Sequence, residues 1–350
     1  MSQLVSGGGE HQHSTKWLVF VFAILAIAPF LIVEAGATFR ARLLLLVLIF
    51  ACFAIALDIV FGQTDQLFLF LGALAGVGAY TVAGLTDLLG INPWLVLPIS
   101  ALAAGVIGLM VSYVAARRRM TIIVIAILTL SLQLVSEQVF EAWISLTGGT
   151  TGIRFNGLEI PLLVELFDQV FDPRVGGRIA TYYVILVGFI AIVLGYRHMM
   201  NSKYGLAFKA IRQDEVAAES IGINVIKYKV IAGFTAAFII GAIGPFYAQS
   251  EAWVTPSLFT FIRVDVIVLI MLVLGGMRTL TGPIVGAAIV IYLNEMLRFA
   301  ERWTTAIFGF LLIILFLYFR EGIVPKGRDI WYSGGVSALV TQLRNRFIGD

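Results

Sequence analysis

The chain has 350 residues, of which 60% are hydrophobic and 13% are charged, and its formal net charge is +3. Soluble domains carry about 25% charged residues, so this composition excludes an ordinary water-soluble globule. The single cysteine, Cys52, excludes an intrachain disulfide framework. We therefore predict an all-α polytopic membrane protein surrounded by lipid. The small cationic excess indicates loop asymmetry rather than nucleic-acid binding.

Ten apolar segments are candidates for crossing the bilayer, which takes about 20 mainly apolar residues. The third is rich in glycine and the eighth is short, so either one is a candidate for a broken or re-entrant helix. We therefore expect about ten transmembrane helices, within a range of eight to eleven. In chain order the segments are 17–33, 43–61, 66–84, 94–115, 120–143, 179–196, 230–249, 264–278, 282–299 and 304–320.

Lysine and arginine side chains predict the orientation, because cytoplasmic loops of membrane proteins carry an excess of them. With both termini in the cytoplasm, the inside segments hold 16 basic residues and the outside segments hold 8. This orientation places the long loop 197–229 inside and the other long loop, 144–178, outside. The predicted order is a cytoplasmic tail at 1–16, a multi-pass domain in the cell membrane at 17–320, and a cytoplasmic tail at 321–350.

The loop 197–229 is the one long departure from the hydrophobic background, with six basic and three acidic residues. Residues 206–221 are rich in helix formers, and Gly222 suits the end of a helix. We predict a short helix there, with an open face at Ala217 and Ala218 on which another protein docks. The alternative is a solvated connector between two membrane helices.

Several polar side chains fall within or beside the predicted spans, where they are costly and usually face a bundle interior or water. Gln133 and Glu137 share one face of the fifth span, and they either line a solute path or make structural hydrogen bonds. Asp58 lies late in the second span, where we expect a structural cap or a gate. Others flank the eighth and ninth spans: Arg263, Asp265, Glu295 and Arg298.

Glycine and proline interrupt the helical pattern between the eighth and ninth spans, at Gly275, Gly276, Gly282 and Pro283. A re-entrant turn would present free backbone groups to a solute. A tight turn would simply connect two spans. Both interpretations stay open from the residues alone.

Motifs for chemistry are missing from the sequence. No G-x-x-x-x-G-K-[ST] loop occurs, so the chain does not bind ATP in the manner of P-loop proteins. No H-E-x-x-H occurs, and His11, His13 and His198 lie outside the predicted spans. We therefore predict no catalytic residue, no metal site and no cofactor in this chain, which is not an enzyme and takes energy from a partner. The alternatives are an ion-coupled secondary transporter and an intramembrane enzyme, which need deep charged pairs or reactive clusters.

Several residue patterns match one known family. In the long loop they are Ser202, Gly205, Ala210-Ile211-Arg212, Asp214-Glu215, Ala217-Ala218-Glu219 and Gly222-Ile223-Asn224. Elsewhere they are Ala56-Leu57-Asp58 before Gly62, Gly76, Gly78-Ala79-Tyr80-Thr81, Leu146-Thr147-Gly148-Gly149 before Gly152, Tyr247-Ala248, Pro256 before Phe259, and Leu274-Gly275-Gly276 before Gly282-Pro283 and Gly286-Ala287. Over about residues 40–325 the chain resembles the permease subunits of branched-chain amino-acid ABC importers, and within the LivH/LivM family it is LivM-like.

The resemblance implies a translocation path for leucine, isoleucine and valine that are delivered by an external solute-binding protein. It also implies a second homologous permease subunit and two ABC ATPase subunits, which bind the ATP and Mg. The loop residues that it assigns to ATPase coupling are Gly205, Ala210, Arg212, Asp214, Glu215, Ala217, Ala218, Glu219 and Gly222. Candidates for lining the path are Gln66, Phe68, Phe70, Leu71, Gly76, Gly78, Tyr80, Gln133, Gly275 and Gly276.

The sequence departs from the family pattern where Phe68, Phe70 and Leu71 replace Ser, Gly and His. If this segment lines the path, the bulkier side chains change the size or polarity of the accepted solute. Urea, short amides and other amino acids are therefore alternatives to branched-chain amino acids. The loop also has Lys203 for Pro and Leu206 for Arg, and docking is expected to survive both because the Ala-Ala-x-x-x-Gly core is present.

Overall fold

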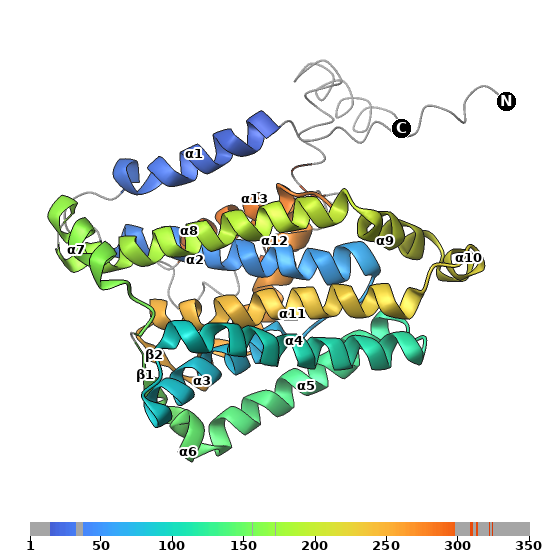
Figure 1. Cartoon of the computed structure of the whole chain (residues 1–350), viewed down its shortest axis with the longest axis horizontal. Helices are drawn as coiled ribbons and strands as arrows, with labels where there is room; N and C mark the ends of the chain where they lie inside the picture. The colour runs from blue at the N-terminus through green and yellow to red at the C-terminus, as the bar shows by residue number, and fades with distance from the viewer. Residues whose placement is uncertain are drawn as a thin grey trace.

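The computed structural model describes residues 15–32, 38–155, 157–171 and 173–297, together with residues 309, 310, 313, 322 and 324. Within this part the chain is almost entirely helical (Figure 1). The strands in the described residues are β1 (Ile153–Arg154) and β2 (Trp253–Val254), which pair antiparallel with Ile153 opposite Val254. The predicted all-α class is confirmed.

Six helices among the described residues are long and apolar enough to cross a membrane, which confirms a polytopic protein. They coincide with the predicted second to seventh spans and are α2 (Thr38–Leu57), α3 (Leu71–Leu89), α4 (Pro93–Arg117), α5 (Ile122–Ala142), α8 (Pro173–Met200) and α11 (Val225–Ser250). The predicted first and ninth spans appear as α1 (Thr15–Ile32) and α13 (Gly282–Leu297), whose apolar parts are shorter. The predicted tenth span, 304–320, and most of the two tails lie outside the described residues.

The predicted third and eighth spans are both irregular at their N-terminal ends. α2 runs into a π-helix, η1 (Asp58–Gly62), and residues 65–70 then form neither helix nor strand, so that α3 begins only at Leu71. The eighth segment is a π-helix, η4 (Ile262–Val266), followed by α12 (Ile267–Gly275), which has nine residues and is too short to cross alone. We call residues 65–70 the α2–α3 break.

α11 lies at the centre of the bundle and packs most extensively against α4, with α3 and α2 on its other sides (Figure 1). Small residues bring these backbones together, as is common in membrane helices. A Cβ on Gly78 of α3 would lie 2.3 Å from the Gly241 carbonyl oxygen of α11, and one on Gly108 of α4 would lie 2.3 Å from the Ala237 Cβ. The core is therefore held by backbone contact as well as by buried side chains.

Two groups of short elements lie at opposite ends of the helix bundle (Figure 1). One end holds α6 (Ile144–Thr147), the 3-10 helices η2 (Gly149–Thr151) and η3 (Pro256–Phe259), the β1–β2 pair, and α7 (Pro161–Val170). The other end holds α9 (Lys203–Gln213) and α10 (Glu215–Ser220). The two long loops that the sequence assigns to opposite sides of the membrane thus lie at opposite ends of the molecule.

Basic side chains follow the same division in the described part of the chain. At the α9–α10 end, Arg119 contacts α10 and Arg278 lies beside the α2–α3 break. At the opposite end, Arg42 and Arg263 both pair with Glu251. These basic residues thus lie at two opposite ends of the structure. The assignment of the α9–α10 end to the cytoplasm stays a prediction.

Candidate functional site

The turn into α9 is closely packed. Ser202 Oγ accepts a hydrogen bond from the Tyr204 backbone N–H at 3.2 Å, which is the usual role of a serine before a helix. A Cβ on Gly205 would lie 2.0 Å from the Met200 carbonyl oxygen. Only glycine fits there without moving the backbone, so Gly205 fixes how α9 leaves the end of α8.

Asp214 ends α9 and starts α10. Its Oδ1 accepts hydrogen bonds from the backbone N–H groups of Val216 and Ala217, at 2.8 and 3.0 Å, and its own backbone is extended. The single helix predicted over 206–221 is therefore two helices, and that prediction was wrong because Asp214 caps a new helix. The result is a bent α9–α10 segment (residues 203–220) instead of a straight rod.

The outer surface of the α9–α10 segment and of Ile221, which follows it, is apolar at several positions. The side chains of Leu206, Val216 and Ile221 are 69%, 65% and 75% exposed, and Ala217 is exposed as well. Exposed apolar patches mark surfaces that contact another protein or a membrane. These side chains are the exposed apolar part of the segment.

The inner surface of the segment packs on the bundle. Ala218 is buried against Ile211 of α9 and Val225 of α11, and the partly buried Ala210 packs against this cluster. Of the two alanines predicted to form an open face, Ala217 is therefore available, whereas Ala218 holds α10 against α9 and α11. This small apolar cluster fixes the angle between the two short helices.

Gly222 closes the segment in a left-handed conformation, with φ of +86°. Its N–H donates to the Glu219 carbonyl at 2.9 Å, and a Cβ built on it would meet nothing within 4 Å. Glycine adopts this conformation at little cost, and other residues do so with some strain. A large side chain at this position would project outward without displacing neighbouring atoms.

Two ion pairs attach α10 to the ends of longer helices. Glu219 pairs with Arg119, which follows α4, at 2.8 Å, and both side chains are exposed. Glu215 pairs with Lys229 of α11, whose side chain is buried. An exposed pair contributes little to stability, whereas separating Lys229 from Glu215, which is 42% exposed, leaves an unpaired charge on a buried lysine. The Glu215–Lys229 pair is therefore the stronger of the two links.

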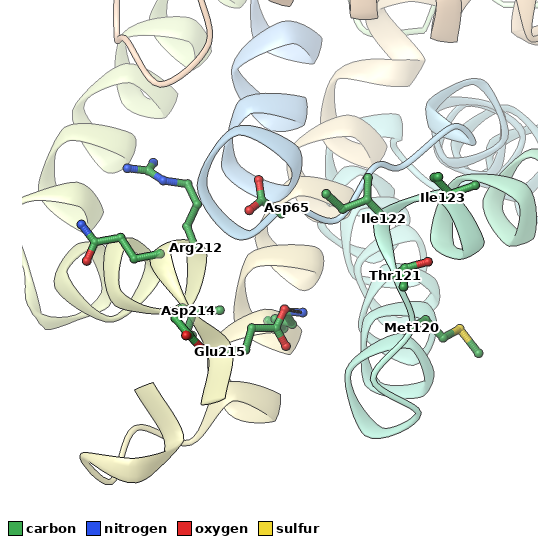
Figure 2. Close-up of a pocket in the computed structure, with 11 residues that line it drawn as sticks. Asp65, Met120, Thr121, Ile122, Ile123, Arg212, Asp214 and Glu215 are labelled. Carbon is green, nitrogen blue, oxygen red and sulfur yellow. Dashed lines mark hydrogen bonds and ion pairs between the residues drawn. The ribbon is translucent and has the colours of Figure 1, made fainter. Parts of the chain in front are cut away.

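A pocket of about 460 Å³ lies between the α9–α10 junction, the α2–α3 break and the start of α5 (Figure 2). Asp65 lies between the junction and the start of α5, where Ile122 and Ile123 also line the pocket (Figure 2). Burial raises the pKa of the Asp65 carboxyl, and the positive charges of Arg278 and Arg212 oppose this effect. The pocket separates the α9–α10 junction from the start of α5.

Asp58 organises the end of α2. It is fully buried, and its carboxylate accepts hydrogen bonds from the Tyr196 hydroxyl at 2.6 Å, the Gln63 side chain at 3.1 Å and the Arg278 backbone N–H at 2.7 Å. A Cβ on Gly62 would lie 2.1 Å from Asp58 Oδ1, so the glycine leaves room for the carboxylate. These contacts are those of a structural cap, which is one of the two roles that the sequence suggests for Asp58.

Two arginines from different elements reach the same point of the chain, the Gly62 carbonyl. Arg278, in the turn after α12, donates to it from Nε at 3.1 Å and lies 3.6 Å from Asp65 Oδ1. Arg212 of α9 reaches it from Nη1 at 3.5 Å and donates to Gln63 Oε1 at 3.3 Å. Burial and the charge of Arg278 lower the pKa of Arg212. Arg212 therefore turns inward from the α9–α10 segment.

The first N–H groups of α3 find their partners on other helices. Leu71 N and Gly72 N donate to the two carboxylate oxygens of Asp265, at 2.6 and 3.2 Å, and Ala73 N donates to Gln133 Oε1 at 2.7 Å. Gln133 also donates to the Phe259 carbonyl at 2.6 Å. Because a helix end inside a membrane cannot use water, these buried side chains allow the break to exist there.

The role of Asp265 was missed from the sequence, which marked it only as flanking the eighth span. It lies 194 positions from the Leu71 N–H that it binds, so no local pattern reveals the contact. Gln133 has the structural hydrogen bonds that were one of its two interpretations. Both side chains are fully buried.

The other candidates for a solute path are enclosed within this chain. Phe68 and Phe70 are buried and meet edge to face, with ring centroids 5.0 Å apart. Buried Tyr80 packs on Phe140, and a Cβ on Gly76 would also touch that ring. Three more are buried in the same way: Gln66, Leu71 and Gly78. Their role in lining a path stays a prediction.

Gly275 and Gly276 lie where α12 turns back into α13. A Cβ on Gly275 would lie 1.9 Å from the Gly282 carbonyl oxygen, and Gly276 has φ of +112°. Of the two interpretations of this segment, a tight turn between two packed helices describes its geometry. Within the residues that the structure describes, no group of three or more His, Cys, Asp or Glu side chains gathers as a metal site would require.

Comparison with known proteins identifies the family. A family model described as "Branched-chain amino acid transport system / permease component" matches residues 39–317. The high-affinity branched-chain amino acid transport system permease protein LivM of Salmonella typhimurium is 25% identical over 332 residues, which cover 90% of this chain and 76% of that protein. The protein of the same name from Escherichia coli is 26% identical over 332 residues, which again cover 90% of this chain and 76% of that protein.

A more distant similarity extends to a protein of Methanocaldococcus jannaschii described as "Probable branched-chain amino acid transport permease protein LivH". It is 25% identical over 230 residues, which cover 63% of this chain and 67% of that protein. No solved structure matches the chain. Since the family model spans most of the sequence, including the α9–α10 segment and the α2–α3 break, this chain belongs to the family of branched-chain amino acid transport permease components.

Proposed function

We propose that this chain is the permease subunit of an ATP-driven ABC importer, with its α9–α10 segment as the coupling element for a separate ATPase subunit. In this assembly it pairs with a second homologous permease and with two ATPase subunits, which hold the ATP and Mg. Closure of the ATPase pair displaces the α9–α10 segment, and the two permease bundles then expose the path to the opposite side of the membrane.

The exposed apolar surface of the α9–α10 segment is the observation that carries this proposal. It lies at one end of the bundle and outside the six long helices. The sequence contains no P-loop, so ATP-driven transport by this chain would need a separate ATPase. An ATPase that docks on Leu206, Val216 and Ile221 satisfies both requirements.

Leucine, isoleucine and valine are the proposed solutes, delivered by an external binding protein to the opposite end of the bundle. The names of the relatives support this choice, since they describe branched-chain amino acid transport. Elements α6 and α7 form part of the surface at that end. The solute is then handed from the binding protein into a path completed by the second permease.

Co-purification tests the coupling role. The tagged chain is isolated in mild detergent from its native membrane, and associated proteins are identified by mass spectrometry. A Gly222→Arg variant is prepared in parallel, with Gly90→Arg as its matched control. Gly90 shares the left-handed conformation and the open surroundings of Gly222 but ends α3, away from the α9–α10 segment. Both substitutions therefore add the same bulk and similar strain.

The expected result is that a P-loop ATPase co-purifies with the wild type and with Gly90→Arg, and is lost from Gly222→Arg. Loss from both variants would point to general misfolding and would remove the evidence for docking at Gly222. If a folded wild-type chain brings down no ATPase, the ABC importer proposal fails and an ion-coupled transporter takes its place.

Uptake by the reconstituted assembly tests the solute. Vesicles that contain the permease pair and ATPase, with ATP inside them and the binding protein outside, are supplied with labelled leucine or labelled urea. ATP-dependent accumulation of leucine that unlabelled valine competes away is the expected outcome. Accumulation of urea instead would show that the solute differs from that of the relatives, and it would leave the coupling role intact.

A further inference from the structure

The α9–α10 segment is joined to the α2–α3 break by polar side chains that face away from its docking surface. Arg212 is grouped with the docking residues by resemblance, yet its guanidinium contacts Gln63 and the Gly62 carbonyl. Lys229, which pairs with Glu215 of α10, offers its own backbone carbonyl to Gln66 Nε2 at 3.1 Å. Both short helices are thereby connected to residues 62–66.

The pocket beside the α9–α10 junction limits the other contacts of the segment on this side. It separates the α9–α10 junction from Ile122 and Ile123 of α5, so no close-packed apolar contact fills that space (Figure 2). On this side of the segment, Arg212 is the side chain that crosses from α9 to the residues at the end of α2. Arg212 is therefore the α9 side chain that acts directly on Gln63 and Gly62, while Tyr196 of α8 also bonds Gln63 at 3.0 Å.

The backbone of the α2–α3 break has features that would let it follow a displacement of Gly62. Asp65 has φ of +53°, a conformation that non-glycine residues rarely adopt. Asp65 N–H still donates to the Phe61 carbonyl at 3.1 Å, but residues 67–70 lie outside both helices. They lead directly into the α3 N-terminus, which Asp265 and Gln133 hold from other elements. A shift at Gly62 is thus passed to the point where α3 begins inside the bundle.

We propose that Arg212 is a positioning residue that transmits displacement of the α9–α10 segment to residues 62–72. This inference rests on the proposed function, because it needs a partner that moves the segment. It differs from docking: Arg212 acts on the interior of its own chain, whereas Leu206, Val216 and Ile221 meet the partner. Arg278, in the α12–α13 turn, also donates to the Gly62 carbonyl and holds it from the other side of the contact.

A second route through the molecule competes with this one. Ile211, Ala218 and Val225 form an apolar cluster that joins the segment directly to the start of α11. If motion passes through that cluster, α11 moves as a rigid body and the Arg212 contacts merely follow. The experiment must therefore separate the two routes at the level of residues 62–72.

Hydrogen–deuterium exchange on the complex with its co-purified ATPase makes this separation without knowledge of the solute. Exchange is compared with and without ATP for the wild type, for Arg212→Met and for Lys227→Met. Methionine keeps much of the length of either side chain and removes its charge. Lys227 is an exposed cation near the start of α11 whose side chain faces solvent, so it serves as the matched control.

In the wild type and in Lys227→Met, ATP is expected to change the exchange of amides in both 203–220 and 62–72. In Arg212→Met the change at 203–220 should persist, with the ATPase still bound, while the change at 62–72 falls at least about fivefold. An undiminished response at 62–72 would overturn the proposal in favour of the apolar route. Loss of the ATPase from Arg212→Met would overturn it too, by placing Arg212 in docking.

The isolated chain provides a readout that does not depend on any partner. Without the ATPase, Arg212→Met should speed amide exchange at Gln63–Gln66 relative to Lys227→Met, because one anchor of that segment is gone. Equal exchange in the two variants would show that Arg212 does not hold the break. A wild-type chain that binds no ATPase refutes the coupling function itself, and this outcome is recognised by the co-purification alone.

Discussion

At the scale of single residues, Asp265 holds the backbone where α3 starts inside the bundle. Replacing it with alanine leaves the Leu71 and Gly72 N–H groups without acceptors, and each buried unsatisfied group costs about 1–3 kcal/mol. Asp265→Ala should therefore lower the melting temperature of the purified protein in detergent. Asp87→Ala, which removes an exposed carboxylate near the other end of the same helix, is the control and should cause no loss.

Gly205 gives a second prediction at this scale. A single methyl group added there meets the Met200 carbonyl at 2.0 Å, whereas one added at Gly195 of α8 meets nothing within 4 Å. Gly205→Ala should displace the start of α9 and weaken ATPase co-purification. Gly195→Ala should leave it unchanged and stabilise α8 by up to about 1 kcal/mol, since alanine favours a helix. Equal behaviour of the two variants would show that the α8–α9 turn tolerates rearrangement.

At the scale of elements, the two short helices differ in how much they depend on a cap. α10 has six residues, so the two hydrogen bonds to Asp214 are a large part of what holds it. Asp214→Ala should cost about 1 kcal/mol and speed amide exchange in residues 216–220. Asn224→Ala removes the corresponding cap from the 26-residue α11, and exchange beyond its first turn should not change.

The elements also show where sequence reasoning succeeds. The six long helices were predicted because a continuous apolar run needs no tertiary information. Asp214 carried a usable signal, since an aspartate directly before Glu-Val-Ala-Ala is a preferred helix start. The bend between α9 and α10 could have been predicted from it.

Other features depend on contacts between distant parts of the chain. Residues 66–70 are apolar enough to be read as helix, yet they form neither helix nor strand. Thr129 of α5 bonds the Leu69 N–H and the Leu67 carbonyl, while Gln133 and Asp265 bind the first N–H groups of α3. The inward direction of Arg212 depends in the same way on Gln63, which lies 149 positions earlier. Neither contact leaves a periodic pattern in the sequence.

At the scale of the whole molecule, the two ends of the bundle give a prediction about orientation. Native Cys52 is buried, so an introduced cysteine is the thiol that an external reagent reaches. A membrane-impermeant maleimide should label Leu162→Cys of α7 in intact cells, because that side chain is 75% exposed at the end assigned to the outside. Lys227→Cys should be labelled only after permeabilisation.

The reverse labelling pattern would place the α9–α10 segment outside the cell, where no ATP-driven partner operates. It would therefore refute the coupling proposal together with the orientation. The test uses only the charge distribution and the helix arrangement, so its outcome does not depend on which solute is carried.

The close contacts of α11 with α4 and α3 have a consequence for how this sequence can evolve. Gly78, Gly108 and Gly241 each sit where one added carbon would collide with a neighbouring backbone or Cβ atom. Substitution of these glycines should therefore disrupt the packing. Substitution on the outward face of α5, of which little is buried, should have little effect on it. Among diverging relatives, change should accumulate on the outward face of α5, while its buried Thr129 and Gln133 and the centre of the bundle stay almost invariant.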